Sequence, residues 1–218
     1  MIIKTFLIIL FIITYLHIII HLNITNDNSI YNITDVSKEI IHNKIMDKTP
    51  FYFNGITISS SLKLDNYKKH KTYYEKTYDS IELLEPTVKC YPKHNIYPLQ
   101  KNNYIRLHTN LECRNFYKVS SGSVYIVCIH PKYKSMFKES GNKFISNKKI
   151  MDYIKTNSSF IHIILHTNHI LFLPNYWLIY IISKEPDTIV EKIQYSTILN
   201  QSCFLYEKIK HKCVEFYK

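Results

Sequence analysis

The sequence predicts a mainly β domain preceded by one transmembrane helix. Two observations lead to this prediction: an uninterrupted apolar segment at Thr5–Leu22, and a later series of short runs rich in Ile, Val, Tyr and Phe. Runs of this kind, separated by turn residues, are typical of strands in a sandwich or barrel. A length of 218 residues suits one domain with an appendage. We therefore expect a membrane anchor over residues 1–22, a stalk over 23–34 and one domain over 35–218.

The apolar segment Thr5–Leu22 carries no charged side chain over 18 residues. Roughly 20 such residues span the hydrocarbon core of a bilayer. A cleavable signal peptide has a shorter apolar run of about 7–15 residues that ends in small residues, which Asn23–Thr25 do not supply. The segment therefore favours a retained signal anchor, while cleavage stays open. Lys4 before the span and Asp27 after it favour a lumenal or extracellular C-terminal domain, in a host endomembrane or a virion membrane.

Modification sites depend on that location. Asn-x-Ser/Thr sequons are glycosylation acceptors in a lumenal domain; they occur here at Asn23, Asn32, Asn157 and Asn200. The five cysteines are Cys90, Cys113, Cys128, Cys203 and Cys213. They form no CxxC pair and no Cys/His zinc spacing, so a structural zinc site is not expected. Cys203 and Cys213 are candidates for a local disulfide in an oxidising compartment.

The polar segment after the anchor leads into a short amphipathic helix. Thr34 or Asp35 is a suitable N-cap, and the helix is expected to run to about Met46, before Pro50. A second helix is expected at Lys148–Lys155. The β-like runs follow one another along the rest of the chain. They are Phe51–Ile58, Tyr104–His108, Ser123–Ile129, Phe160–Leu165, Ile170–Leu173 and Trp177–Ile182.

The formal net charge of +11 says little about partners. The chain contains no alanine and is rich in Ile, Lys, Asn and Tyr, which is the residue usage of an AT-rich genome such as that of a large DNA virus or of some parasites. The densest basic run, Lys63–Lys76, interleaves lysines with tyrosines, as a nucleic-acid groove would. A solvated surface loop is the expected interpretation, and nucleic-acid binding stays an alternative.

Two segments together resemble the JmjC-type, cupin-like 2-oxoglutarate oxygenases. Tyr104–Pro131 (YIRLHTNLECRNFYKVSSGSVYIVCIHP) resembles the stretch with His-x-Asp, a following Asn and a Gly-x-Lys turn before an apolar strand. Ile170–Ser183 (ILFLPNYWLIYIIS) resembles the strand, Pro-x-x-Trp-x-His and strand that come later in the family. The resemblance implies a double-stranded β-helix, a form of jelly roll. Four residues match the family's fold motifs: Asn115, Gly122, Pro174 and Trp177.

The functional positions of the family are mostly altered in this chain. Fe(II) in such enzymes needs two His and one carboxylate, with open positions for 2-oxoglutarate and oxygen. His108 matches the first histidine and is the one candidate metal ligand. Asn110 replaces the carboxylate, Val124 the cosubstrate lysine and Ile179 the distal histidine. We therefore expect no catalytic or cofactor-binding residues and no cofactor.

The resemblance, the apolar segment and the residue usage together lead us to expect a catalytically inactive, membrane-anchored cupin-like domain of a viral membrane protein, with a binding or structural role and a protein partner. The alternative is a divergent 2-oxoglutarate/Fe(II) protein hydroxylase with a rearranged metal site. Further histidines that might build such a site are incidental in the expected interpretation, and Glu112 is the nearest carboxylate to Asn110. These histidines are His162, His166 and His169. His17 and His21, one helical turn apart near the end of the apolar segment, are expected to be interfacial polar residues instead.

Overall fold

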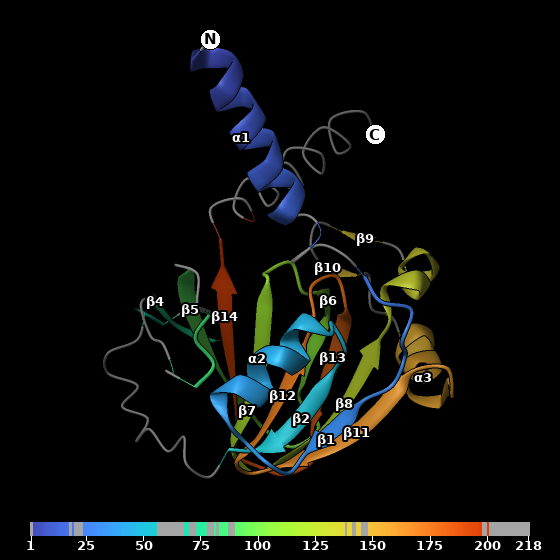
Figure 1. Cartoon of the computed structure of the whole chain (residues 1–218). Coiled ribbons are helices and arrows are strands. Elements are labelled where there is room, and N and C mark those ends of the chain that lie inside the picture. The colour runs from blue at the N-terminus through green and yellow to red at the C-terminus, as the bar shows by residue number, and fades with distance from the viewer. Residues whose placement is uncertain are drawn as a thin grey trace.

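The computed structural model describes residues 2–17, 19, 24–55, 68–69, 73–77, 81, 83–86, 90–137, 139–140, 143–144, 148–197 and 200. Two antiparallel-rich sheets make up the body of the molecule, and a helix stands off one end of it (Figure 1). The prediction of a mainly β chain is confirmed.

The larger sheet, sheet A, has eight strands in the order β1-β2-β12-β7-β14-β5-β4-β3. Its strands are β1 (Tyr31–Ile33), β2 (Phe51–Asn54), β3 (Lys68–Lys69), β4 (Tyr74–Thr77), β5 (Tyr91–Leu99), β7 (Arg114–Ser121), β12 (His169–Leu173) and β14 (Thr188–Ser196). Sheet B has six strands in the order β11-β8-β13-β6-β10-β9. They are β6 (Tyr104–Thr109), β8 (Ser123–Ile129), β9 (Glu139–Ser140), β10 (Lys143–Phe144), β11 (Ile161–His166) and β13 (Leu178–Ser183).

The strand pairs are nested, and this nesting defines the topology. β8 pairs with β11, β7 with β12, β6 with β13 and β5 with β14, all antiparallel. The pairs fall alternately in sheet B and sheet A. Strands β5 to β8 thus pair with β11 to β14 as one long antiparallel hairpin. This hairpin is rolled up so that successive strand pairs lie alternately in the two facing sheets. This arrangement is a jelly roll.

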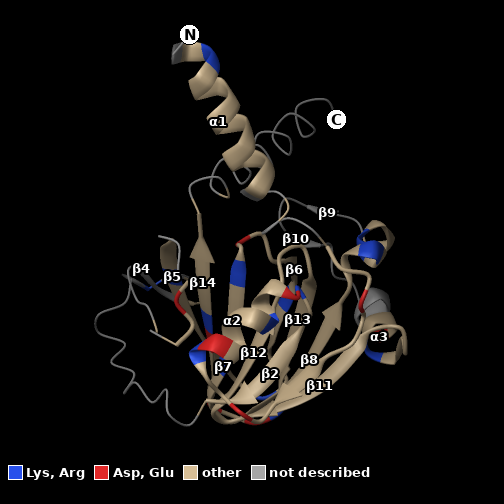
Figure 2. Cartoon of the chain, in the orientation of Figure 1, with Lys and Arg blue, Asp and Glu red and all other residues tan. Residues whose placement is uncertain are grey.

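Three apolar clusters hold the layers together. The cluster between the sheets contains Trp177, Ile179, Val124 and Tyr117, each at most 1% exposed. Helix α2 (Lys38–Met46) covers the outer face of sheet A, where Ile41 packs with a second cluster. Helix α3 (Lys148–Thr156) and the 3-10 helix η3 (Pro131–Met136) belong to the outer side of sheet B, beside a third cluster. Most of the ribbon in both sheets carries neither charge colour in Figure 2.

Several predicted bounds need correction. The cap of α2 is Ser37, whose side chain accepts a hydrogen bond from the Ile40 amide, and not Thr34 or Asp35. The segment expected to be a stalk includes β1, which pairs in parallel with β2 and buries Ile33. Eight strands were not predicted, and the longest of them are β5, β7 and β14. They carry charged or amide side chains that the sequence pattern assigns to solvent.

Helix α1 (Ile2–His17) overlaps the predicted membrane segment Thr5–Leu22. Its apolar side chains are exposed, with Ile3 75%, Phe6 63% and Phe11 72% accessible. Within the described part of the chain, no helix combines the length and hydropathy needed to cross a bilayer. His21 and Asn23 lie outside the described residues, and the side chain of His17 is not described either.

Candidate functional site

The nested pairing places the two histidine positions of the resemblance beside each other. His108 on β6 is the direct cross-strand partner of Ile179 on β13. A bulge follows this pair, because Ile181 is next matched with Ile105, and the bulge lets both Ile105 and His108 face the interior. The isoleucine, fully buried, packs in the cluster between the sheets. An aliphatic side chain therefore occupies the position that pairs with His108.

His108 belongs to a polar group that crosses from sheet B to sheet A, here called the interior cluster: His108, Asn110, Tyr117 and Lys192. The Nε2 atom of His108 lies 3.0 Å from the Tyr117 hydroxyl and 3.3 Å from the Lys192 ammonium nitrogen. Its Nδ1 atom lies 2.9 Å from the Arg106 carbonyl oxygen, to which it donates. The imidazole is thus oriented from both sides by groups of the chain itself.

The Asn110 side chain is fully buried and both ends of its amide are engaged. Its oxygen accepts a hydrogen bond of 2.6 Å from the Tyr117 hydroxyl, and its nitrogen donates to the Trp177 carbonyl at 3.3 Å. The backbone repeats this connection, because the Asn110 amide donates to Trp177 and its carbonyl accepts from Tyr176. Asn110 therefore joins two loops through both its side chain and its backbone.

Burial controls the charges of the interior cluster. It lowers the pKa of Lys192, and the carboxylate of Glu112 opposes that shift. It raises the pKa of the Tyr117 phenol well above its ordinary value, so this hydroxyl remains a donor. The sequence pattern missed Tyr117 and Lys192. The signal that would have found them is the two-residue strand period, which puts Tyr117 on the face of Asn115 and Lys192 on the face of Val190.

The residues present do not fit the iron and 2-oxoglutarate implied by the resemblance. Val124, in place of the cosubstrate lysine, is fully buried in the apolar cluster between the sheets. Among the described residues, no three His, Cys, Asp or Glu side chains lie close enough to hold a metal ion. Glu112 instead accepts a hydrogen bond from the Leu111 amide at 3.3 Å. No reaction step is therefore assigned to an iron centre here.

The other histidines lie apart from His108. His162 on β11 accepts or donates hydrogen bonds with the Tyr125 hydroxyl at 2.6 Å and the Asn157 carbonyl at 2.8 Å. His166 and His169 flank the next turn, with ring centroids 6.0 Å apart. His162 and His166 alternate with Ile163 and Leu165, which pack inside the sandwich, so these two histidines face its outer side. The displaced site considered from the sequence is not assembled.

The four motif residues have structural roles. Asn115 is fully buried and donates to the carbonyls of Glu112 and Leu173. Gly122 turns the chain from β7 to β8 with a φ of +76°, and a Cβ there would lie 2.5 Å from the Thr188 hydroxyl. Trp177 is 1% exposed and contacts the His130 ring edge-on, at a centroid distance of 5.0 Å. Pro174 is buried directly after β12.

The predicted sequons, the cysteines and the basic run lie partly within the described residues and partly outside them. Of the sequons, Asn32 is exposed, Asn157 is half-buried and Asn200 is 1% exposed. Cys90, Cys113 and Cys128 are free thiols, whereas Cys203 and Cys213 lie outside the described residues. Most of Lys63–Lys76 also lies outside them, so the basic run cannot be given a surface.

No protein-family model matches the chain, and no curated protein matches it in sequence. Among solved structures, a cupin superfamily protein from Desulfitobacterium hafniense matches with a TM-score of 0.32 and 8% identity, over 60% of this chain and 83% of that one. Coconut allergen cocosin matches with a TM-score of 0.36 and 8% identity. Procruciferin, the 11S globulin of Brassica napus, matches with a TM-score of 0.36 and 9% identity.

The match spans 31% of the length of cocosin and of procruciferin, and it covers 63% of this chain in both cases. Because these likenesses are weak, the fold assignment depends on the nested strand order of the chain itself. That order makes it a mainly β protein of two sheets with a jelly-roll topology.

Proposed function

We propose that the chain is a catalytically inactive, membrane-tethered jelly-roll domain of JmjC-like ancestry that acts by binding a protein partner or by structural display. The observation that carries this proposal is the pairing of His108 with Ile179, together with the engagement of the Asn110 amide by Tyr117 and Trp177. The residues that hold the scaffold together are kept, whereas those that would perform oxygenase chemistry are replaced. A fold alone does not fix an activity.

Full-length protein, purified anaerobically in detergent and offered Fe(II) with 2-oxoglutarate, is expected to bind neither in stoichiometric amount. Metal content measured by elemental analysis and cosubstrate binding measured by calorimetry check this. The double variant Asn110→Asp/Ile179→His is the positive control, because it sets a carboxylate and a second imidazole beside His108. Near-stoichiometric iron in the unmodified chain that disappears in His108→Ala would instead establish the divergent hydroxylase.

The membrane tether is proposed to be the Thr5–Leu22 segment, with the jelly roll lumenal or extracellular. Its support is the apolar surface of α1, which exposes Ile3, Phe6 and Phe11 while standing off the sheets (Figure 1). The transfer of such surface out of water is strongly favourable. The residue usage of an AT-rich genome supports a viral source.

On expression in eukaryotic cells, the full chain is expected to remain with membranes after alkaline carbonate extraction. It is also expected to carry glycan at Asn32, whose side chain is exposed. Loss of a glycosidase-sensitive mass shift in Asn32→Gln measures this, with Asn200→Gln as the matched control at a buried sequon. Release of the protein by carbonate, or an unglycosylated domain accessible from the cytosol, would contradict the tether and its orientation.

A further inference from the structure

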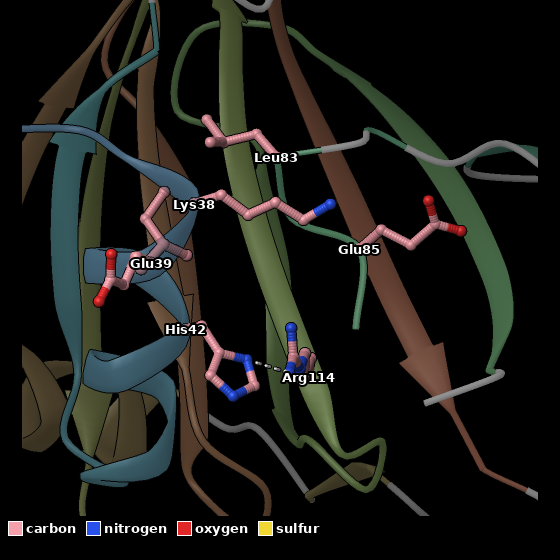
Figure 3. Close-up of a pocket in the computed structure, with 7 residues that line it drawn as sticks. Lys38, Glu39, His42, Leu83, Glu85 and Arg114 are labelled. Carbon is pink, nitrogen blue, oxygen red and sulfur yellow. Dashed lines mark hydrogen bonds between the residues drawn. The ribbon is translucent and has the colours of Figure 1, made fainter. Parts of the chain in front are cut away.

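A pocket on the outer face of sheet A is separate from the interior cluster. It has a volume of about 350 Å³ and lies between α2, the segment around Leu83 and the start of β7 (Figure 3). Its lining residues are Lys38, Glu39, Ile41, His42, Leu83, Glu85 and Arg114. Successive residues of a strand face opposite sides of a sheet. Arg114 therefore faces this pocket, while its neighbour Asn115 faces the interior.

Arg114 is the unusual member of the pocket because it is a buried cation, only 5% exposed. One terminal nitrogen donates to the Leu84 carbonyl at 3.4 Å and the other to His42 Nδ1 at 3.3 Å. Its Nε atom is buried and has no hydrogen-bond partner among the described residues. Burial also lowers the pKa of Arg114. A buried guanidinium with an unused donor is costly unless an anion compensates it.

The acidic residues of the pocket do not supply that anion. In Figure 3 the carboxylates of Glu39 and Glu85 point away from the guanidinium, one on each side of the pocket. The amine of Lys38 extends across the opening instead, so a second cation faces the same space. Because His42 accepts a hydrogen bond at Nδ1, it is oriented toward the arginine as a neutral acceptor. Among the described residues, the buried Arg114 guanidinium therefore has no carboxylate partner.

The rest of the lining is apolar. Ile41, 1% exposed, and Leu83 form walls beside the guanidinium. A phosphate or sulfate dianion needs several donors, whereas a carboxylate is matched by one guanidinium edge and a nearby ammonium. The volume equals that of roughly a dozen water molecules at about 30 Å³ each. It lies at the lower end of the range of roughly 300–1,000 Å³ for small-molecule sites.

We propose that this pocket binds a small monocarboxylate with an apolar body. The carboxylate pairs with the Arg114 guanidinium and with Lys38, and the apolar body lies against Ile41 and Leu83. The site does not depend on the proposed loss of oxygenase chemistry, because it is built on the opposite face of sheet A.

Phenylacetate and its neutral isostere phenylacetamide are suitable probes because they differ in charge and hardly in shape. Full-length protein in detergent is expected to bind phenylacetate at least about tenfold more tightly than phenylacetamide, by calorimetry or ligand-observed NMR. Arg114→Met should abolish this preference, and Lys38→Gln should reduce the affinity for the acid about threefold. Lys134→Gln, a change outside the pocket, should leave both affinities unaltered.

Three results would overturn the proposal. They are equal binding of acid and amide, unchanged acid binding in a folded Arg114→Met variant, and absence of acid binding at about 10 mM. Leu83→Trp tests the same pocket in case Arg114→Met does not fold. The tryptophan fills the pocket from its rim while the Arg114 guanidinium is kept. This variant should also lose phenylacetate binding, and retention of binding would place the ligand elsewhere.

Discussion

Glu191→Ala is expected to destabilise the fold by about 3–5 kcal/mol, the range measured when one partner of a buried ion pair is removed. Glu191 is fully buried at the centre of sheet A. One carboxylate oxygen lies 2.7 Å from His94 Nε2 and the other 3.4 Å from the Lys118 ammonium, while Ser120 donates to the carboxylate as well. The substitution leaves the buried His94 and Lys118 without their anion. Chemical denaturation at pH 7 measures the resulting loss in the free energy of unfolding.

The double variant Glu191→Gln/Lys118→Met separates a charge effect from a packing effect. Removing both charges is expected to recover a large part of the stability lost by Glu191→Gln alone. If the double variant is no more stable than the single one, the ion pair is not the cause. Burial by itself would raise the pKa of Glu191, but His94, Ser120 and Lys118 together lower it. The contribution of ionised Glu191 to the stability of the fold is therefore complete above the ordinary carboxyl pKa. It is lost as the pH falls through the lower pKa of the folded state.

Lys48→Met is expected to have the opposite sign and to stabilise the protein by about 2–3 kcal/mol at pH 7. Lys48 follows helix α2 and is 6% exposed. Burial lowers its pKa to about 8, with a smaller contribution in the same direction from Arg114 and an opposing one from Cys113. The folded state thus holds this ammonium less readily than the unfolded chain does. Methionine keeps the stem of the side chain and removes the charge.

The pH dependence gives the sharper measurement. Since the folded pKa is lower than the unfolded one, the penalty is complete below pH 8, decreases as the pH rises and is gone above the unfolded pKa. The stability difference between Lys48→Met and the unmodified protein should narrow correspondingly. Lys44→Met, at an exposed lysine paired with Asp47, is the matched control and should change stability by less than about 0.5 kcal/mol. A constant difference between pH 7 and pH 10 would contradict the assignment.

The sequence pattern succeeded where apolar alternation and local caps determine structure. The strand Ser123–Ile129 was predicted with its observed bounds, and the first helix after the apolar N-terminal segment ends at Met46 as expected. It failed for β5, β7 and β14, which form the centre of sheet A. These strands contain His94, Lys118 and Glu191, which a linear pattern assigns to solvent because their partners come from other strands.

The sequence by itself determined a mainly β chain, an apolar N-terminal segment and the types of side chain present at Asn110, Val124 and Ile179. These properties follow from side-chain type and local periodicity. Only the tertiary structure decided which distant residues meet. His108 and Lys192 are 84 residues apart, and the Arg114 guanidinium reaches His42 across 72. Such contacts depend on the register of nested strand pairs, because a shift of one residue would turn each side chain to the other face of its sheet.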